Sequence, residues 1–291
     1  MLERLLTKLR AHPFDIILTT AAYFGVVFSL MSGTPTDPPT SDFAYYMDMA
    51  NGLYVPDPFG KRILMPFIVG LLGANIYVFH YINLILVTFS AVLLYMSNGK
   101  NKQSFISALL YLGCTRAITM YAGEPSPDGM TYFLIASTIF LVGKNYDWLN
   151  IVVFVLAAAN HPISFVIVVA VFVISNYESP IKLLYLIPGA IVFLFLLPSS
   201  YGYIYFPDLP RLLNVVKSVN VLWLGILTIR KDKESFLLLS IILSCLGFSL
   251  VASNIDRILS PLGLFLAPRF VSLLYPPEQD QTIDSENPNN G

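Results

Sequence analysis

SDFAYYMDMANGLYVPDPFGKR, residues 41 to 62, is a polar, aromatic and acidic stretch between two apolar runs. Asp42 and Asp48 flank the Tyr45-Tyr46 pair, and the stretch closes with Lys61-Arg62 directly before another apolar segment. A spacer needs no such concentration of ionisable and aromatic side chains. The stretch is therefore our first candidate for a functional site, and the rest of the chain shows in what setting that site would lie.

The composition predicts an integral membrane protein. Of 291 residues 56% are hydrophobic and only 12% are charged, with a mean hydropathy of +0.68, whereas a soluble domain carries about a quarter charged residues. The net charge of −1 says nothing about partners, but the lack of a basic patch makes nucleic acid an unexpected partner. Cys114 and Cys245 lie inside apolar runs, where a free thiol usually behaves as a small buried hydrophobe.

Recurrent apolar runs predict an all-α, polytopic helical bundle in a single domain over residues 1–274. The ten runs are Phe14–Met31, Ile76–Met96, Phe105–Tyr121, Met130–Val142, Trp148–Ala159, Ile163–Ser175, Leu183–Leu197, Leu212–Ile229, Phe236–Ala252 and Ile258–Leu274. Several are shorter than the roughly 20 residues that cross a bilayer upright. Short helices are tolerated where protein buries them, so we expect about ten membrane segments.

The distribution of cations predicts the orientation, because cytoplasmic loops collect Lys and Arg. With both termini in the cytoplasm, the inner side holds Arg4, Lys8, Arg10, Lys100, Lys102, Lys144, Lys182, Arg230, Lys231 and Lys233. Only Lys61, Arg62, Arg211 and Arg257 then fall in outer loops. This arrangement predicts an outer loop over residues 32–62.

Three local features complete the predicted topology. Residues 148–175 must leave and return to the inner side, which predicts a re-entrant or short-helix hairpin that turns before Pro162, since proline disfavours helical geometry at His161. Residues 63–73 are too few to cross and predict a short surface helix. Residues 275–291 are acidic and rich in Pro and Asn, and predict a disordered cytoplasmic tail.

The unusual polar residues gather on the predicted outer side. The candidate site residues are Asp42, Arg62, Arg116, Glu124, Asp128, His161 and Arg257. Asp42 is either a solvated loop acid or a general base held at the membrane surface by its aromatic neighbours. Arg116 lies within an apolar run and needs a partner, which Glu124 or Asp128 could supply, either as a structural ion pair or beside a bound lipid phosphate.

His161 has two readings as well, a hydrogen-bonded structural residue at the helix break or a ligand of a metal or a phosphate. The sequence holds no zinc-binding pattern of the H-x-E, H-E-x-x-H or C-x-x-C type. A nucleophile turn of the G-x-S-x-G type is missing too. Zinc-dependent and serine hydrolase classes are therefore not expected.

Several short motifs resemble the polytopic glycosyltransferases of the GT-C superfamily. They are the acid and aromatics Asp42-Phe43-Ala44-Tyr45-Tyr46, the segment PFGKRILMP at 58–66, Pro-Ser-Pro-Asp at 125–128, Asn160-His161-Pro162, and Asp256-Arg257 before the last apolar run. The resemblance covers most of the chain as an arrangement. It implies an enzyme that transfers a sugar from a polyprenyl-phosphate carrier to an acceptor on the outer or lumenal face.

In such an enzyme the acid of the first outer loop serves as the catalytic base or in a metal site, and Asp42 is the matching residue. Arg62, Arg116 and Arg257 would hold the lipid phosphate, with Lys217 as a weaker candidate. The chain departs from the family in having no D-x-D pair in the first loop and no large outer domain. The acceptor, and a cofactor such as a divalent cation, therefore stay open.

Two other classes remain as alternatives. A membrane transporter or lipid flippase would line its path with buried charges near the midplane, which both sides can reach. A non-enzymatic membrane assembly factor is the third possibility. The expected partners are a lipid-linked sugar donor and membrane lipids, and the oligomeric state is open. We expect the plasma membrane, with the endoplasmic reticulum as the alternative, because no retrieval signal ends the sequence.

Overall fold

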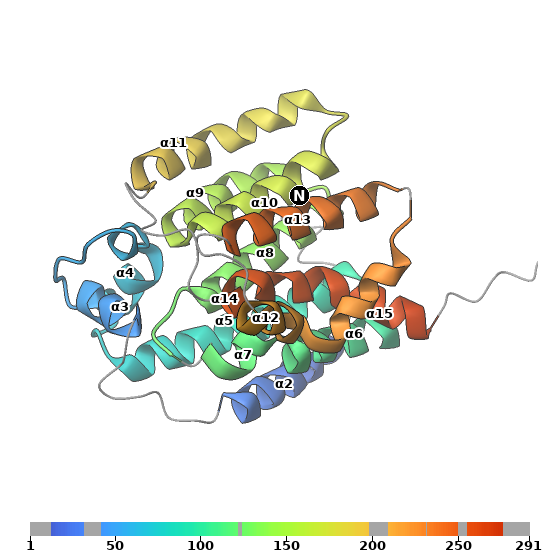
Figure 1. The fold of residues 1–291 in the computed structure, drawn as a ribbon, viewed down its shortest axis with the longest axis horizontal. Coiled ribbons are helices and arrows are strands. Elements are labelled where there is room, and N and C mark those ends of the chain that lie inside the picture. The colour runs from blue at the N-terminus through green and yellow to red at the C-terminus, as the bar shows by residue number, and fades with distance from the viewer. Residues whose placement is uncertain are drawn as a thin grey trace, which may run out of the picture.

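The helices of this chain run mainly along one direction (Figure 1). The computed structural model describes residues 13–31, 42–121, 124–197, 209–230, 232–249 and 255–275. All regular elements in these ranges are helices, so the all-α prediction is confirmed for them. The longer ones are α2 (Pro13–Leu30), α5 (Ile76–Ser97), α6 (Lys102–Cys114), α8 (Asp128–Gly143), α9 (Asn150–Asn160), α10 (Pro162–Ser175), α11 (Ile187–Leu196), α12 (Leu209–Val219), α13 (Lys233–Ser249) and α15 (Gly263–Leu274).

Two helices are long and apolar enough to cross a membrane by length and composition, among the residues described. They are Ile76–Ser97 and the stretch Arg257–Leu274, and seven further apolar helices of 10–17 residues are shorter. Core helices of soluble proteins pass the same test, so these two helices alone do not establish a membrane protein. The topology of about ten membrane segments with both termini in the cytoplasm therefore stays a prediction. Residues 1–12 and 276–291, the predicted tail included, lie outside the described ranges.

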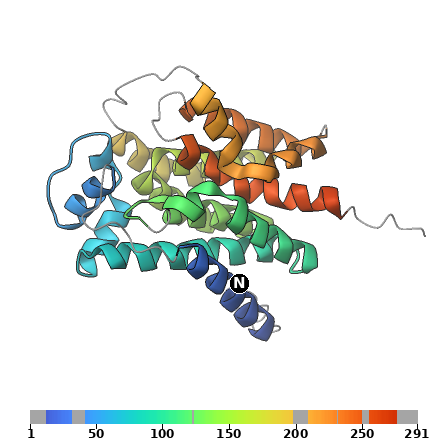
Figure 2. The same ribbon diagram turned by 60° about the horizontal axis from the view of Figure 1, so that its bottom comes forward.

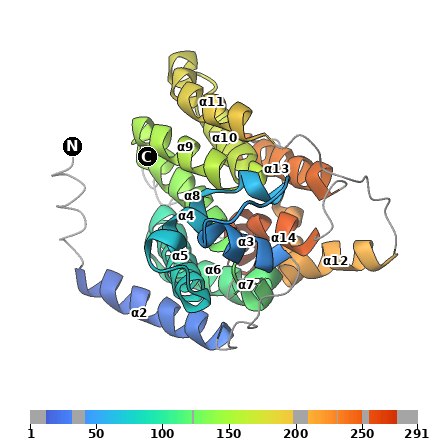
Figure 3. The same ribbon diagram turned by 90° about the vertical axis from the view of Figure 1, so that its left-hand side faces the viewer.

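Successive helices alternate in direction, so the bundle has two distinct ends. The start of α8, the turn between α9 and α10, and the short helices α3 (Asp42–Ala50) and α4 (Leu64–Leu71) share one end, which we call the α3–α4 end. Figure 2 shows the same helices side by side, and Figure 3 looks onto the α3–α4 end. In that view α12 lies across the bundle.

A helix break at His161 separates α9 from α10, and the two helices pack against each other. The His161 backbone is extended, with φ −162° and ψ 137°, and Pro162 is the first residue of α10. Proline at the first helical position costs no hydrogen bond, because the backbone N–H that it lacks would have no partner within the helix. The predicted short-helix hairpin over residues 148–175 is therefore present.

The stretch from 41 to 62 contains more structure than the predicted loop. It holds α3 and the 3₁₀ helix η1 (Phe59–Lys61). Tyr46 is fully buried, and the Tyr45 ring stacks on Phe59 with centroids 4.9 Å apart. Tyr46 is part of the buried core, and the Tyr45–Phe59 stack holds the stretch against itself, whereas the sequence had suggested anchors at a membrane surface. The predicted short helix over residues 63–73 is found as α4.

Two predicted spans are each divided. The run from Phe105 to Tyr121 forms α6 and the short α7 (Arg116–Tyr121), with an extended Thr115 between them at φ −87° and ψ 105°. β-branched residues favour extended backbone, and the start of α15 packs closely here, since a Cβ on Gly263 would clash with the Thr115 hydroxyl. The run from Leu212 divides at Asn220, whose φ is +51°.

Large apolar side chains stay exposed on the outer faces of the bundle. On α5 an exposed apolar stripe is formed by residues spaced four apart, namely Tyr77, Tyr81, Ile85 and Phe89. Each of these residues is 46–55% exposed. Leu194 and Phe195 of α11 are 70% and 79% exposed. Soluble monomers rarely expose contiguous apolar patches larger than a few hundred Å². These faces therefore require an apolar neighbour.

Candidate functional site

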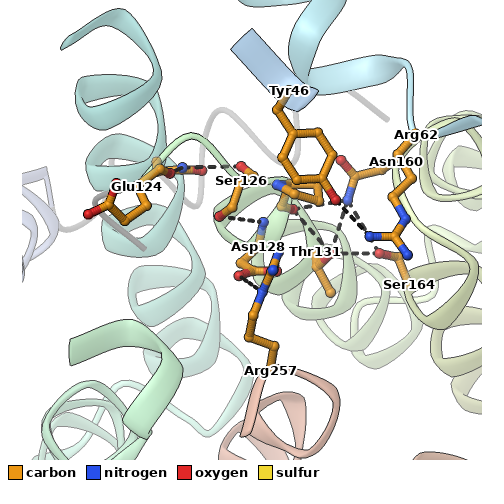
Figure 4. Close-up of polar contacts among 11 residues, drawn as sticks. Tyr46, Arg62, Glu124, Ser126, Asp128, Thr131, Asn160, Ser164 and Arg257 are labelled. Atoms are coloured by element: carbon orange, nitrogen blue, oxygen red, sulfur yellow. Dashed lines mark hydrogen bonds and ion pairs between the residues drawn. The ribbon is translucent and has the colours of Figure 1, made fainter. Parts of the chain in front are cut away.

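A buried ion pair links two distant parts of the sequence at the α3–α4 end (Figure 4). Arg257, on the short helix α14 (Ile255–Leu259), donates from Nε to Asp128 Oδ2 at 2.7 Å and from Nη2 to Oδ1 at 3.2 Å. The two side chains are 8% and 10% exposed. Asp128 begins α8, where the helix dipole stabilises a negative charge. This two-bond geometry is the strongest form of arginine–carboxylate contact.

Arg62 is a second cation at this end, and it is half-buried. Its Nη1 donates to the Tyr46 hydroxyl at 2.7 Å, and its guanidinium lies 5.1 Å from the centre of the Phe59 ring. Its Nε is buried and has no hydrogen-bond partner in the described structure. A buried donor on a charged group is costly to leave unsatisfied. Arg62 is therefore suited to bind an anion.

His161 lies within the electrostatic reach of both arginines. Burial, followed by the charges of Arg62 and Arg257, lowers the pKa of His161 well below its usual value. Its Nδ1 accepts a hydrogen bond from the Ile163 backbone N–H at 3.2 Å and so caps α10. A neutral histidine that accepts at Nδ1 carries its proton on Nε2. His161 is thus a neutral hydrogen-bond donor beside two cations.

A network of amide and hydroxyl groups holds α8 against the α9–α10 turn. Asn160 Nδ2 donates to the Pro127 carbonyl at 3.1 Å and lies 3.0 Å from Thr131 Oγ1 and 3.3 Å from Ser164 Oγ. The two hydroxyl oxygens are 2.7 Å apart. The Oδ1 atom of Asn160 is buried without a partner in the described structure. The network therefore fixes the start of α8, which carries Asp128, against the turn that carries His161.

Asn83 of α5 fixes the loop that leads into α8. Its Nδ2 donates to the carbonyls of Glu124 at 3.1 Å and Ser126 at 3.2 Å. Gly129 allows this approach, because a Cβ there would meet both the backbone and the side-chain oxygen of Asn83. Substituting Gly129 would therefore displace Asn83 and the turn that carries Asp128.

The other predicted site residues are placed as follows. The backbone of Asp42 begins α3, and its side chain lies outside the described part. The next residue, Phe43, has its ring 5.6 Å from the Arg257 guanidinium, so the start of α3 is adjacent to the ion pair. Arg116 begins α7, which packs against α14, and Glu124 lies beyond the end of that helix. The weaker candidate Lys217 is on an exposed part of α12.

One expectation about Arg116 needs correction. Arg116 begins α7, which ends at Tyr121, and Glu124 lies in a bend beyond it. Asp128, one of the two expected partners of Arg116, is paired with Arg257 instead. The reason is topological, because α14 returns to the start of α8 from a position more than a hundred residues further along the chain. Sequence separation concealed this contact.

Five residues outside the set of predicted site residues also make contacts here, and two of these, Tyr46 and Asn160, were named before only as parts of motifs. They are Tyr46, Asn83, Thr131, Asn160 and Ser164. One of them carried a readable signal, since Thr131 follows Asp128 by three residues on α8. Residues three and four apart lie on the same helical face. In the described ranges, no group of three or more His, Cys, Asp or Glu side chains could hold a metal ion.

No family model, curated protein or solved structure matches this chain. Its class is therefore defined by its own geometry, an all-helical bundle with a largely buried cluster of Arg62, Asp128, His161 and Arg257 at one end. We refer to these four residues as the polar cluster.

Proposed function

We propose that this chain is a multi-pass membrane glycosyltransferase of the GT-C type, which takes a sugar from a polyprenyl-phosphate carrier. One observation carries the proposal: Arg62, with a buried and unpartnered Nε, lies beside a neutral His161 and the Asp128–Arg257 pair. The acceptor, the sugar and any divalent cation stay open. Membrane location, by default the plasma membrane, is part of the proposal.

The exposed apolar faces support the membrane half of the proposal. Lipid chains would cover the aromatic and aliphatic stripe of α5 and the outer face of α11. The short α9–α10 hairpin is also suited to a membrane, because helices of this length are tolerated there when other helices bury them. Ten segments with both termini inside remains the topology that the cations favour.

Charge balance supports phosphate as the ligand. Within the polar cluster, Asp128 neutralises Arg257 and His161 is uncharged, so Arg62 supplies one uncompensated positive charge. A phosphate oxygen at Arg62 Nε would satisfy that donor, and His161 Nε2–H provides a second one. Preorganised donors aimed at an anion stabilise charge that develops during a reaction.

The chemistry follows from these positions. Asp42 removes the proton from an acceptor hydroxyl, whose oxygen attacks the anomeric carbon of the sugar. The bond between this carbon and the phosphate oxygen breaks, and the electron pair leaves with the carrier phosphate. Arg62 stabilises that departing negative charge, while Arg257 keeps Asp128 and the start of α3 in place.

The transporter alternative is less well supported by the positions of the ion pairs. Asp128–Arg257 lies at the start of α8, and Asp147–Lys182, with 2.6 Å between Oδ2 and Nζ, lies beyond its other end. A midplane path would place charges between these two positions. These two ion pairs instead lie at the two ends of the bundle.

Cysteine labelling tests the membrane and orientation proposal. Tyr54 is 91% exposed at the α3–α4 end, and Lys144 is exposed at the opposite end. With Cys114 and Cys245 replaced by alanine, we expect a membrane-impermeant thiol reagent to label Tyr54→Cys on intact cells. Lys144→Cys should be labelled only after permeabilisation. Labelling of both variants on intact cells, or recovery of the protein in the soluble fraction, would contradict the proposal.

Substituting Arg62 tests the phosphate site. Arg62→Gln should weaken binding of the polyprenyl-phosphate sugar at least about tenfold, because a hydrogen bond to a charged group contributes about 1.5–3 kcal/mol. The measurement is the Kd of the purified variant for the labelled donor. Lys61→Gln is the matched control, since this neighbour makes no hydrogen bond or ion pair in the described structure. Equal affinities for both variants would remove Arg62 from the site.

A further inference from the structure

A cavity lies at the opposite end of the bundle from the polar cluster. Its volume is about 710 Å³, within the roughly 300–1,000 Å³ of small-molecule sites. The end of α10 lines one wall with Val173, Ile174 and Tyr177, and α13 lines another with Phe236 and Leu239. The walls are therefore mainly apolar and are contributed by two neighbouring helices.

Polar groups are confined to one part of this cavity. Ile229, Arg230, Asp232 and Ser235 complete its lining. Ser235 Oγ accepts from the Arg230 backbone N–H at 2.9 Å, and Asp232 Oδ1 accepts from the Ser235 backbone N–H at 2.7 Å. These two bonds fix the turn between η4 (Asn220–Thr228) and α13. Arg230 is consequently held at the polar edge of an apolar cavity.

The charges at this edge leave Arg230 available for an anion. The Asp232 carboxylate caps α13, and its pKa is lowered by the bonds to Ser235 and by the charges of Arg269 and Arg230. Arg269 Nη1 also donates to Ser235 Oγ at 3.2 Å. The Arg230 guanidinium, by contrast, takes part in no hydrogen bond or ion pair within the described residues. Asp232 thus faces two arginines, Arg269 and Arg230, and the edge carries a net positive charge.

From this combination we infer that the cavity between α10 and α13 binds an anionic phospholipid, with an acyl chain against the apolar walls and the phosphate at Arg230. The inference rests on the proposed membrane location but is independent of sugar transfer. The predicted orientation places this end in the cytoplasmic leaflet, which carries the anionic lipids. Arg230 belongs to the sequence run Arg230-Lys231-Asp232-Lys233, which has a net positive charge.

Native mass spectrometry of the full-length purified protein tests the inference. Incubated with equal amounts of phosphatidylglycerol and phosphatidylcholine, the protein should retain phosphatidylglycerol preferentially. Arg230→Gln should reduce that preference about fivefold, since one basic residue near the surface contributes about 1 kcal/mol toward anionic lipid. Lys144→Gln removes an exposed cation from the same predicted face and should leave the preference unchanged.

A second variant tests the cavity itself. Leu239 is 46% exposed in the lining, so Leu239→Trp can fill space without entering the core. It should abolish retention of the bound lipid at an unchanged unfolding temperature. Equal retention of both lipids by the unmodified protein, or an unaltered preference in Arg230→Gln, would overturn the inference. A change of oligomeric mass in Leu239→Trp would do the same, because it would identify a second copy of the chain as the occupant.

Discussion

Replacing Arg257 by glutamine should lower the free energy of unfolding by about 3 kcal/mol or more, because the Asp128 carboxylate would stay buried without its cation. Both side chains are at most 10% exposed, so water cannot take the place of the guanidinium. The variant also loses the contact with the Phe43 ring. Unfolding of the purified protein in detergent, monitored by circular dichroism against denaturant concentration, measures the loss.

A double-mutant cycle distinguishes the pair from general damage. Asp128→Asn combined with Arg257→Gln should be clearly less destabilised than the sum of the two single variants, since residues in contact couple. Lys182→Gln is the control, because Lys182 pairs with Asp147 but is 33% exposed, and its loss should be smaller. Strictly additive effects of the two substitutions would show that the contact contributes nothing of its own.

Replacing Asp42 by asparagine should reduce sugar transfer by a factor of about 10² to 10⁴, the usual contribution of general base catalysis. Asparagine keeps the size of the side chain and removes the basic oxygen. The stability of the protein and its affinity for the donor should stay close to those of the unmodified chain. The support for this prediction is the position of Asp42 at the start of α3, next to Phe43 and hence to Arg257.

Asp48 provides the matched control for this experiment. It lies on the same helix, six residues further along the chain, and carries the same functional group. Asp48→Asn should therefore retain the transfer rate of the unmodified protein. If Asp42→Asn is as active as Asp48→Asn, Asp42 is not the base. If both lose activity together with donor binding, α3 acts as a structural unit and the base lies elsewhere.

Local features of the fold could be predicted from the sequence because single residues determine them. Pro162 predicted the break between α9 and α10, and the short apolar segment before Gly73 predicted α4. The two predicted spans that are divided in the structure have local causes, which the apolar pattern does not reveal. Thr115 and Asn220 interrupt two runs whose hydrophobicity is continuous, because hydropathy does not register an extended or positive-φ backbone.

The site could be predicted as a group of residues but not as a set of contacts. The distribution of Lys and Arg predicted an orientation in which Arg62, His161 and Arg257 lie on the same side. In the structure these three residues lie near one another. Their partners were not predictable in the same way. Asp128 pairs with Arg257 and not with Arg116, and Tyr46 binds Arg62 instead of facing a membrane surface. Such choices depend on how the helices return to the α3–α4 end.

The most direct test of the proposed function is discharge of the carrier. Purified full-length protein would be incubated with polyprenyl phosphates that carry radiolabelled sugars, and loss of label from the lipid phase would be measured over time. We predict that the unmodified protein releases the label from at least one carrier and that Arg62→Gln, at the same donor concentration, releases it more slowly. Label that stays on every carrier, with the donor bound at equal affinity by both proteins, would contradict the account.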